Sequence, residues 1–345
     1  MRNTDPFAWF TEHRDTIFRW CGITGVLLVL FLLLSRQVRR HGGWRVAGAR
    51  LRRETAVTAL AFTAPLRAWL RYRRSLRLLT ALLGDPALWR DCERALLTVR
   101  DAAGPAARPY AVLADAATVW VLLAGPAGGP AALRPPEPWF EEPGDPGVWG
   151  IGRAGLPAVA PAAGGPCPVL VALGEQDRAC AFLDLAAGPR ITAVDGDEHN
   201  RRMLTQALAA QLDARLPRGL VTVAAGVHPR YPGMPLRDAY RAARAAAAAA
   251  ADGSRSGTGT GTGESAGALP AVLAAPELPD PLPPELAAPP GRAAAPRVLV
   301  TGRGRGHVRY VPVDRYGRAA VAGTPLLTEA AALGRAVART LRRFP

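Results

Sequence analysis

The chain has 345 residues, with 43 arginines, no lysine and 28 acidic residues, and its formal net charge is +15. Without lysine the protein can form neither a Schiff base nor the lysine–phosphate contact of a Walker A loop, which excludes pyridoxal enzymes and standard P-loop ATPases. The four cysteines include no Cys-x-x-Cys pair, which fits a reducing compartment better than a disulfide framework.

The first element along the chain is an apolar segment that we expect to cross a membrane. Large apolar residues run without interruption from Val26 to Leu34, and their neighbours extend the segment to residues 17–35. A span needs about 20 residues to cross the hydrocarbon core. Arginines from Arg36 onward meet no acid before Glu54, and basic flanks stay in the cytoplasm. We therefore predict a single-pass protein of the cell inner (plasma) membrane, with residues 1–16 as an extracytoplasmic tail and the C-terminal domain in the cytoplasm.

Residues 36–104 are predicted to form a basic juxtamembrane helical hairpin. Residues 36–77 hold twelve arginines and one acid, whereas the rest of the chain carries a net charge of only +4. Basic charge concentrated beside a bilayer favours the lipid bilayer and its anionic headgroups as partner, at about 1 kcal/mol per residue, and disfavours nucleic acid. The residues expected at the membrane surface are Arg36, Arg39, Arg40, Arg45, Arg52, Arg53, Arg71, Arg73 and Arg74.

The hairpin prediction rests on apolar spacing. Apolar residues within 63–83 recur at every third or fourth position, which is typical of an amphipathic helix. Asp85 and Pro86 supply a cap and a first-turn proline for a second helix, and the short connection predicts an antiparallel pair. Three roles stay open for the apolar stripe. It can pack on the next helix, lie in the membrane surface, or join two copies as a homodimer through helix 63–83.

Residues 105–251 are predicted to form an α/β domain. Strands are expected at Tyr110–Leu113, Thr118–Leu123, Val169–Leu173, Ala179–Leu185, Ile191–Val194 and Arg218–Ala224, with helices at 197–212 and 236–251. The alternation of strands and helices in the second part implies a mixed sheet with at least one parallel pair and helices packed on it.

Residues 252–295 are predicted to be a disordered linker. This stretch begins with a Gly-Thr repeat and continues with a proline-rich run. Such composition does not bury enough apolar surface to offset chain entropy. Residues 296–345 contain three strand-like segments and a helix opened by Pro325, and we expect them to complete the α/β domain.

Two local segments are candidates for ligand binding. The turn Asp195–Asn200 stands between a strand and a helix, and a helix N-terminus can hold an anion. Its single glycine and three acids favour a capped helix instead. Residues Thr301–His307, TGRGRGH, resemble arginine–glycine segments that contact RNA or phosphate, although a turn between strands fits them better. The histidines and serines follow no catalytic or metal-binding spacing. We therefore expect no enzyme activity and no catalytic, cofactor or metal site.

The sequence also carries a resemblance. The segments CPVLVALGEQDRACAFLDLAAGPRITAVDGDEHNRRMLTQALAAQL and RVLVTGRGRGHVRYVPVDRYG are similar to a module of uncharacterised single-span membrane proteins and large regulators of high-GC bacteria. In some regulators the module lies near LysM repeats and a bacterial transcriptional activator domain, which this chain lacks. The resemblance covers residues 110–231 and implies no reaction. The element order resembles a translocase-like ATPase that has lost its phosphate loop.

Together these patterns predict a membrane-anchored, non-catalytic cytoplasmic domain that acts in protein interaction or as a scaffold, with an unidentified protein partner. The alternative is a membrane-tethered nucleotide- or nucleic-acid-binding domain of a degenerate ATPase type.

Overall fold

The computed structural model describes residues 22–33, 36, 65–125, 134–158, 166–256, 268–287 and 295–341. The chain divides into two compact units, Met1–Leu70 and Arg71–Pro345. In the first unit the described residues form a helix over 22–33 and the start of a second helix, which spans 65–83. Within the described ranges, no helix combines the length and the apolar character that crossing a bilayer requires. The predicted span 17–35 lies partly outside these ranges, and the tail 1–16 lies wholly outside them.

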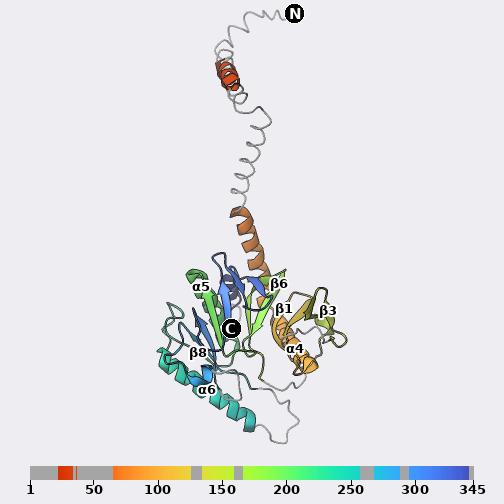
Figure 1. Ribbon diagram of the computed structural model, residues 1–345, viewed down its shortest axis with the longest axis vertical. Helices are drawn as coiled ribbons and strands as arrows, with labels where there is room; N and C mark the ends of the chain where they lie inside the picture. The colour runs from red at the N-terminus through yellow and green to blue at the C-terminus, as the bar shows by residue number, and fades with distance from the viewer. Residues whose placement is uncertain are drawn as a thin grey trace, which may run out of the picture. The chain divides into compact units, whose positions relative to one another are not determined.

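The second unit is organised around one sheet, which contains thirteen strands in the part of the chain that the structure describes (Figure 1). Its spatial order is β3-β4-β2-β1-β6-β5-β13-β12-β11-β7-β10-β9-β8. The strands are β1 (Arg108–Ala114), β2 (Thr118–Ala124), β3 (Phe140–Glu142), β4 (Asp145–Gly152), β5 (Leu170–Gln176), β6 (Ala179–Asp184), β7 (Ile191–Gly196), β8 (Val221–Val223), β9 (Val272–Ala275), β10 (Arg297–Thr301), β11 (Val308–Val313), β12 (Arg318–Ala320) and β13 (Leu327–Glu329).

The sheet has an antiparallel half and a parallel half. Every neighbouring pair from β3 to β11 is antiparallel. The pairs from β11 through β7, β10 and β9 to β8 are all parallel. Short turns join most antiparallel neighbours, whereas the helices after β7 and β8 return the chain for parallel pairing. The predicted mixed α/β sheet is confirmed. The element order predicted at least one parallel pair of strands, and the described sheet contains four.

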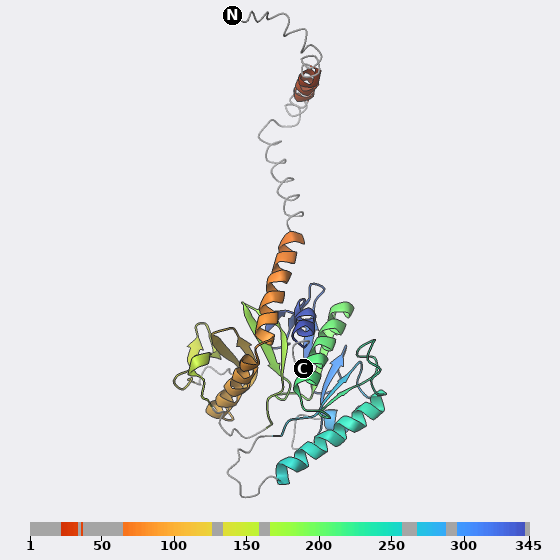
Figure 2. The same cartoon turned by 180° about the vertical axis from the view of Figure 1, so that it is seen from behind.

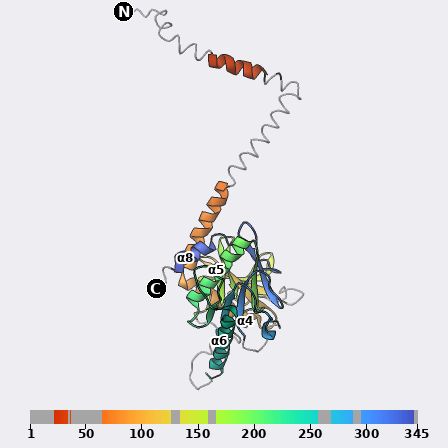
Figure 3. The ribbon, with the colours of Figure 1, turned by 90° about the vertical axis from the view of Figure 1, so that its left-hand side faces the viewer.

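Helices cover both faces of the sheet. They are α4 (Pro86–Ala103), α5 (Glu198–Arg215), α6 (Leu236–Ser256), α7 (Pro284–Ala287) and α8 (Leu333–Leu341), and a 3₁₀ turn lies at Arg153–Gly155. Helix α4 packs on β1 and β2, and α5 packs on β5, β7 and α8, which lies beside it in Figure 3. In β9, Ala274 packs toward Ala209 of α5, while Leu273 and Ala275 pack toward Ala239 and Ala243 of α6. Because alternate residues of a strand point to opposite faces, α5 and α6 lie on opposite sides of the parallel half.

The predicted disordered linker 252–295 is wrong for the residues that the structure describes within it. Residues 268–287 include β9, whose four residues are fully buried between β10 and β8, and the short helix α7. A four-residue strand of small apolar residues between prolines has no recognisable period. It is stable here because neighbouring strands and helices on both faces cover it. Residues 257–267 and 288–294 lie outside the described ranges.

The predicted antiparallel helical hairpin within 36–104 is also wrong in its geometry. Both helices exist, at 65–83 and Pro86–Ala103. In Figures 1 and 2, α4 runs onward from residues 71–83 and does not fold back beside them. Leu76, Leu79 and Leu83 are buried in the core of the second unit, and the α-carbon of Gly84 faces Thr340 of α8. Each helix therefore buries its apolar face in the same core.

Candidate functional site

The predicted membrane-contacting arginines fall into two groups. Arg36 is described and exposed, whereas Arg39, Arg40, Arg45, Arg52 and Arg53 lie outside the described ranges. Arg71, Arg73 and Arg74 are exposed on a helix whose Leu76 and Leu79 are buried at 4% and 0% exposure. Arg77 is exposed as well. The amphipathic spacing thus placed the arginines of the second unit correctly on the solvent side, and we name Arg71, Arg73, Arg74 and Arg77 the arginine face.

The turn Asp195–Asn200 stands where a ligand is often held in parallel α/β sheets. From β7 the chain runs through α5 to β8 on one side of the sheet, whereas from the neighbouring β11 it runs to β12 on the other side. Such a switch point favours a crevice at the carboxyl ends of the strands. The chain itself occupies part of this edge of the sheet. The amide of Asp197 donates to the carbonyl oxygen of Val313 at 3.0 Å, and the amide of Asn200 donates to the Asp197 carboxylate at 3.0 Å. Two of the amides that an anion would use are therefore already bonded.

The glycine of this turn is required by the same close approach. Gly196 has φ +110°, and an added Cβ would lie 2.1 Å from the carbonyl oxygen of Val313. The acids nearby make ordinary surface pairs: Asp195 lies 3.9 Å from Arg201, and Glu198 lies 2.9 Å from Arg202. Such exposed pairs contribute little. The capped-helix interpretation agrees with this geometry. Within the described ranges, no three His, Cys, Asp or Glu side chains gather in a way that would hold a metal ion.

The segment Thr301–His307 connects β10 to β11. Arg305 lies 3.9 Å from Asp280, with both side chains largely exposed. Tyr310 donates its hydroxyl to the carbonyl of Gly304 at 3.0 Å, and a Cβ on Gly304 would lie 2.6 Å from Val308. Gly304 is therefore required by packing, which agrees with the interpretation of this segment as a turn between two strands. The resemblance to RNA-contacting segments stays a prediction.

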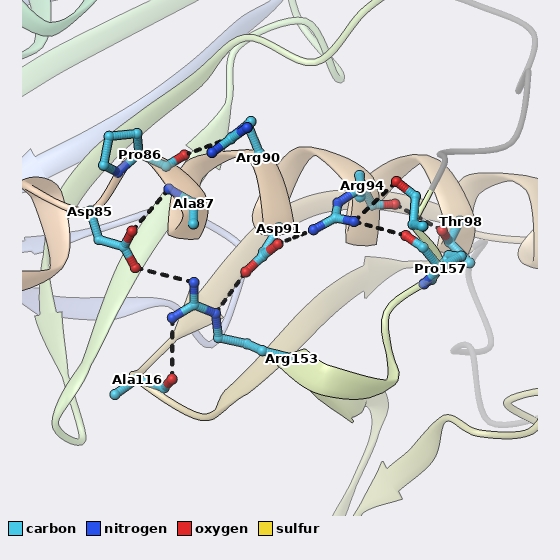
Figure 4. Close-up of polar contacts among 11 residues, drawn as sticks. Asp85, Pro86, Ala87, Arg90, Asp91, Arg94, Thr98, Ala116, Arg153 and Pro157 are labelled. Atoms are coloured by element: carbon cyan, nitrogen blue, oxygen red, sulfur yellow. Dashed lines mark hydrogen bonds and ion pairs between the residues drawn. The ribbon is translucent and has the colours of Figure 1, made fainter.

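An ion-pair cluster that the sequence reasoning did not find joins α4 to the antiparallel half (Figure 4). Arg153 donates to Asp91 at 2.7 Å, to Asp85 at 3.1 Å and to the carbonyl of Ala116 at 3.1 Å. Arg94 bonds the other oxygen of Asp91 and the carbonyl of Pro157. Burial opposes the charge of Arg153, but Asp91 and Asp85 raise its pKa above the ordinary value. Sixty-two residues separate Arg153 from Asp91, so no local pattern signals the pair.

A second cluster ties the loop between β6 and β7, which joins the two halves of the sheet. Arg297 donates to the carbonyls of Gly188 and Pro189 at 2.8 and 3.2 Å, and Arg309 donates to the carbonyl of Asp184 at 2.9 Å. Burial lowers the pKa of Arg297 to about 10, so the guanidinium stays charged at neutral pH. The arginines arrive from β10 and β11, so the C-terminal segment fixes the shape of the central loop. This cluster is structural.

The cysteines of the core are inert by position. Cys92 and Cys180 are completely buried, and burial raises the pKa of each thiol far above its ordinary value. A buried, protonated thiol is a poor nucleophile and a poor metal ligand. These two residues behave as the small buried side chains that their surroundings suggest.

Fold and surfaces define a mixed-sheet α/β protein with an outward arginine face. Comparison of the chain with protein-family models, with curated proteins and with solved structures gives no match.

Proposed function

We propose that the chain is a non-catalytic, membrane-anchored protein whose cytoplasmic α/β domain serves as an interaction or scaffold domain for a protein partner. Residues 17–35 act as the anchor in the inner (plasma) membrane, with residues 1–16 on the outer side. Arginines from Arg36 onward lie against anionic headgroups.

The observation that carries this proposal is the arginine face. Its side chains are exposed while the leucines one turn away are buried in the core. The folded domain therefore holds these charges outward at a fixed place, and basic residues near an anionic surface contribute about 1 kcal/mol each. In the first unit, the described part of the anchor is a helix that includes exposed large apolar side chains, among them Val26 and Leu33, each at 62%. Exposed apolar surface of this kind requires a partner such as lipid.

The test is vesicle co-sedimentation of the full chain and of Arg71→Glu/Arg73→Glu/Arg74→Glu. Vesicles containing anionic phosphatidylserine should retain the native chain more strongly than the variant, and added salt should reduce the difference because the contacts are screened. A matched control is Arg202→Glu/Arg218→Glu/Arg230→Glu, which reverses three other exposed arginines. Equal loss of binding in both variants would mean that only the net charge of the protein matters for vesicle binding, which would contradict a specific role of the arginine face.

The alternative, a tethered nucleotide- or nucleic-acid-binding domain, draws support from one observation only. β7 and α5 stand at the switch point of a parallel sheet, which is the usual place for a nucleotide. The closure of the turn by Val313 argues against a phosphate there. Titration of the full chain with ATP and with a short single-stranded RNA tests the alternative. Saturable binding that is lost in Arg303→Ala/Arg305→Ala would favour it.

A further inference from the structure

A cavity of about 440 Å³ lies at the carboxyl ends of β7 and β11, beside the closed turn. It is bounded by α5, by the start of α8 and by Tyr72, all of which belong to the second unit. Binding sites for small molecules usually fall between about 300 and 1,000 Å³. The cavity is therefore large enough for a ligand with one ring or a short branched chain.

The polar side chains that line this cavity can all donate hydrogen bonds, and none of them is acidic. Tyr72, His199, Asn200 and Arg335 line it, and no carboxylate does. Among the residues that the structure describes, the side chains of Tyr72, His199 and Arg335 have no hydrogen-bond or ion-pair partner. Asn200 uses its amide group to donate to the carbonyl of Asp314 at 2.9 Å, which leaves its oxygen as an acceptor. A cation and several side chains that can donate hydrogen bonds thus line one cavity, and no carboxylate lines it beside them.

The remaining wall is apolar and has room. Leu204 and Leu333 are buried beneath it, and Met203 is 45% exposed at its rim. Gly334 adds no side chain, and an added Cβ there would first meet the Met203 methyl group at 3.6 Å. Methionine adapts its shape to what it contacts. One side of the cavity is therefore suited to an apolar group and the other to an anion.

We propose that this cavity binds a small soluble organic anion, a carboxylate or phosphate ester that carries an aromatic or branched apolar group. Arg335 supplies the charge, and His199 and Tyr72 donate hydrogen bonds to the anion. The apolar group packs on Met203 and Leu333. The recognition uses side chains, because the amides of Asp197 and Asn200 at the start of α5 are already bonded.

The test is isothermal titration of the full chain in detergent with phenyl phosphate, with benzoate and with neutral benzamide. The anions should bind saturably, and benzamide should bind at least about tenfold more weakly because it lacks the charge. Arg335→Gln should weaken phenyl phosphate by about tenfold or more. Gly334→Met should abolish binding by filling the cavity, and it should keep the helix intact because methionine is a better helix former than glycine. Arg339→Gln, on the exposed side of α8, should bind as the native chain does.

Any one of three titration results would overturn the proposal. They are absence of saturation up to roughly 10 mM ligand, equal binding of benzamide, or unchanged binding in Gly334→Met with native circular dichroism. A vesicle arm separates the soluble ligand from a lipid headgroup. If Gly334→Met also loses vesicle binding, the cavity holds a headgroup and the soluble ligand is wrong. Phenyl phosphate binding should persist in Arg71→Glu/Arg73→Glu/Arg74→Glu, so failure of the membrane proposal and failure of the ligand proposal give different results.

Discussion

Asp184 is completely buried at the end of β6, where the antiparallel half of the sheet leads into the parallel half. One carboxylate oxygen accepts hydrogen bonds from the amides of Val169 and Ala186 at 2.9 and 2.8 Å. The other oxygen has no hydrogen-bond partner among the described residues, and Arg100 lies 3.6 Å from it. The residue matters chiefly as an acceptor for two buried amides, and its charge is poorly compensated.

This division predicts different results for two substitutions at neutral pH. Asp184→Ala leaves two buried amides without an acceptor and should lower the free energy of unfolding by about 3 kcal/mol. Asp184→Asn keeps an acceptor oxygen and should lose clearly less. Urea denaturation followed by tryptophan fluorescence measures both, with the exposed Asp213→Asn as control. Equal losses in the two variants would mean that the charge, not the acceptor, stabilises the loop.

Asp184→Asn also tests how the stability of the protein depends on pH. Burial raises the pKa of the Asp184 carboxyl, and the two amide hydrogen bonds and Arg100 offset this only in part. The folded state then holds the proton more tightly than the unfolded chain does. Stability from this group is therefore complete below about pH 4 and is lost as the pH rises through the raised pKa. Asp184→Asn, which does not titrate, should gain stability relative to the native chain between pH 4 and pH 7. A constant difference over that range would contradict the shift.

At the scale of elements, the junction between β7 and β11 shows how one glycine allows two strands to approach closely beside a cavity. Gly196, the last residue of β7, pairs closely with Val313 of β11, and the next amide, that of Asp197, is bonded to the Val313 carbonyl and is not open to an anion. The neighbouring cavity at Tyr72 and Arg335 is left as the open space at this end of the sheet.

Gly196→Ala should therefore destabilise the protein through packing as well as backbone strain. The Cβ would overlap the Val313 carbonyl, so we expect a loss of about 3 kcal/mol or more in the free energy of unfolding. Gly323→Ala is the matched control, because Gly323 also has a positive φ, +77°, but nothing lies within 4 Å of an added Cβ. It should lose only about 1 kcal/mol. Thermal unfolding measures both variants. Similar shifts in melting temperature would show that only the backbone conformation matters at Gly196.

At the scale of the whole molecule, the C-terminal segment completes both halves of the sheet. β10 lies between β7 and β9, and β11, β12 and β13 lie between β7 and β5. Arg297 and Arg309 of this segment also tie the central loop. Without β10, β11, β12 and β13, strand β7 would have no neighbour in the sheet, and the two halves would not be joined by hydrogen-bonded strands.

A fragment of residues 71–341 should therefore unfold in one cooperative transition, and a fragment of residues 71–295 should have none, because it retains strands without their neighbours. Circular dichroism and urea titration compare the two fragments. Co-expression of residues 296–341 with the shorter fragment should restore the transition. A cooperative transition in residues 71–295 alone would show that the first strands form an independent core.

Sequence by itself determined the features that depend on local pattern. These features are the absence of lysine, the arginine density of residues 36–77, the helical period of α4 and α5, and the apolar runs that form β1, β2, β6 and β7. Composition or neighbouring residues alone specify each of them. Only the tertiary structure decided the strand order, the burial of β9, the course of α4 away from residues 71–83, and the contacts of Arg153 and Arg297. Each of these depends on free energy gained between residues far apart in the chain, and a period of two or 3.6 residues carries no information about such partners.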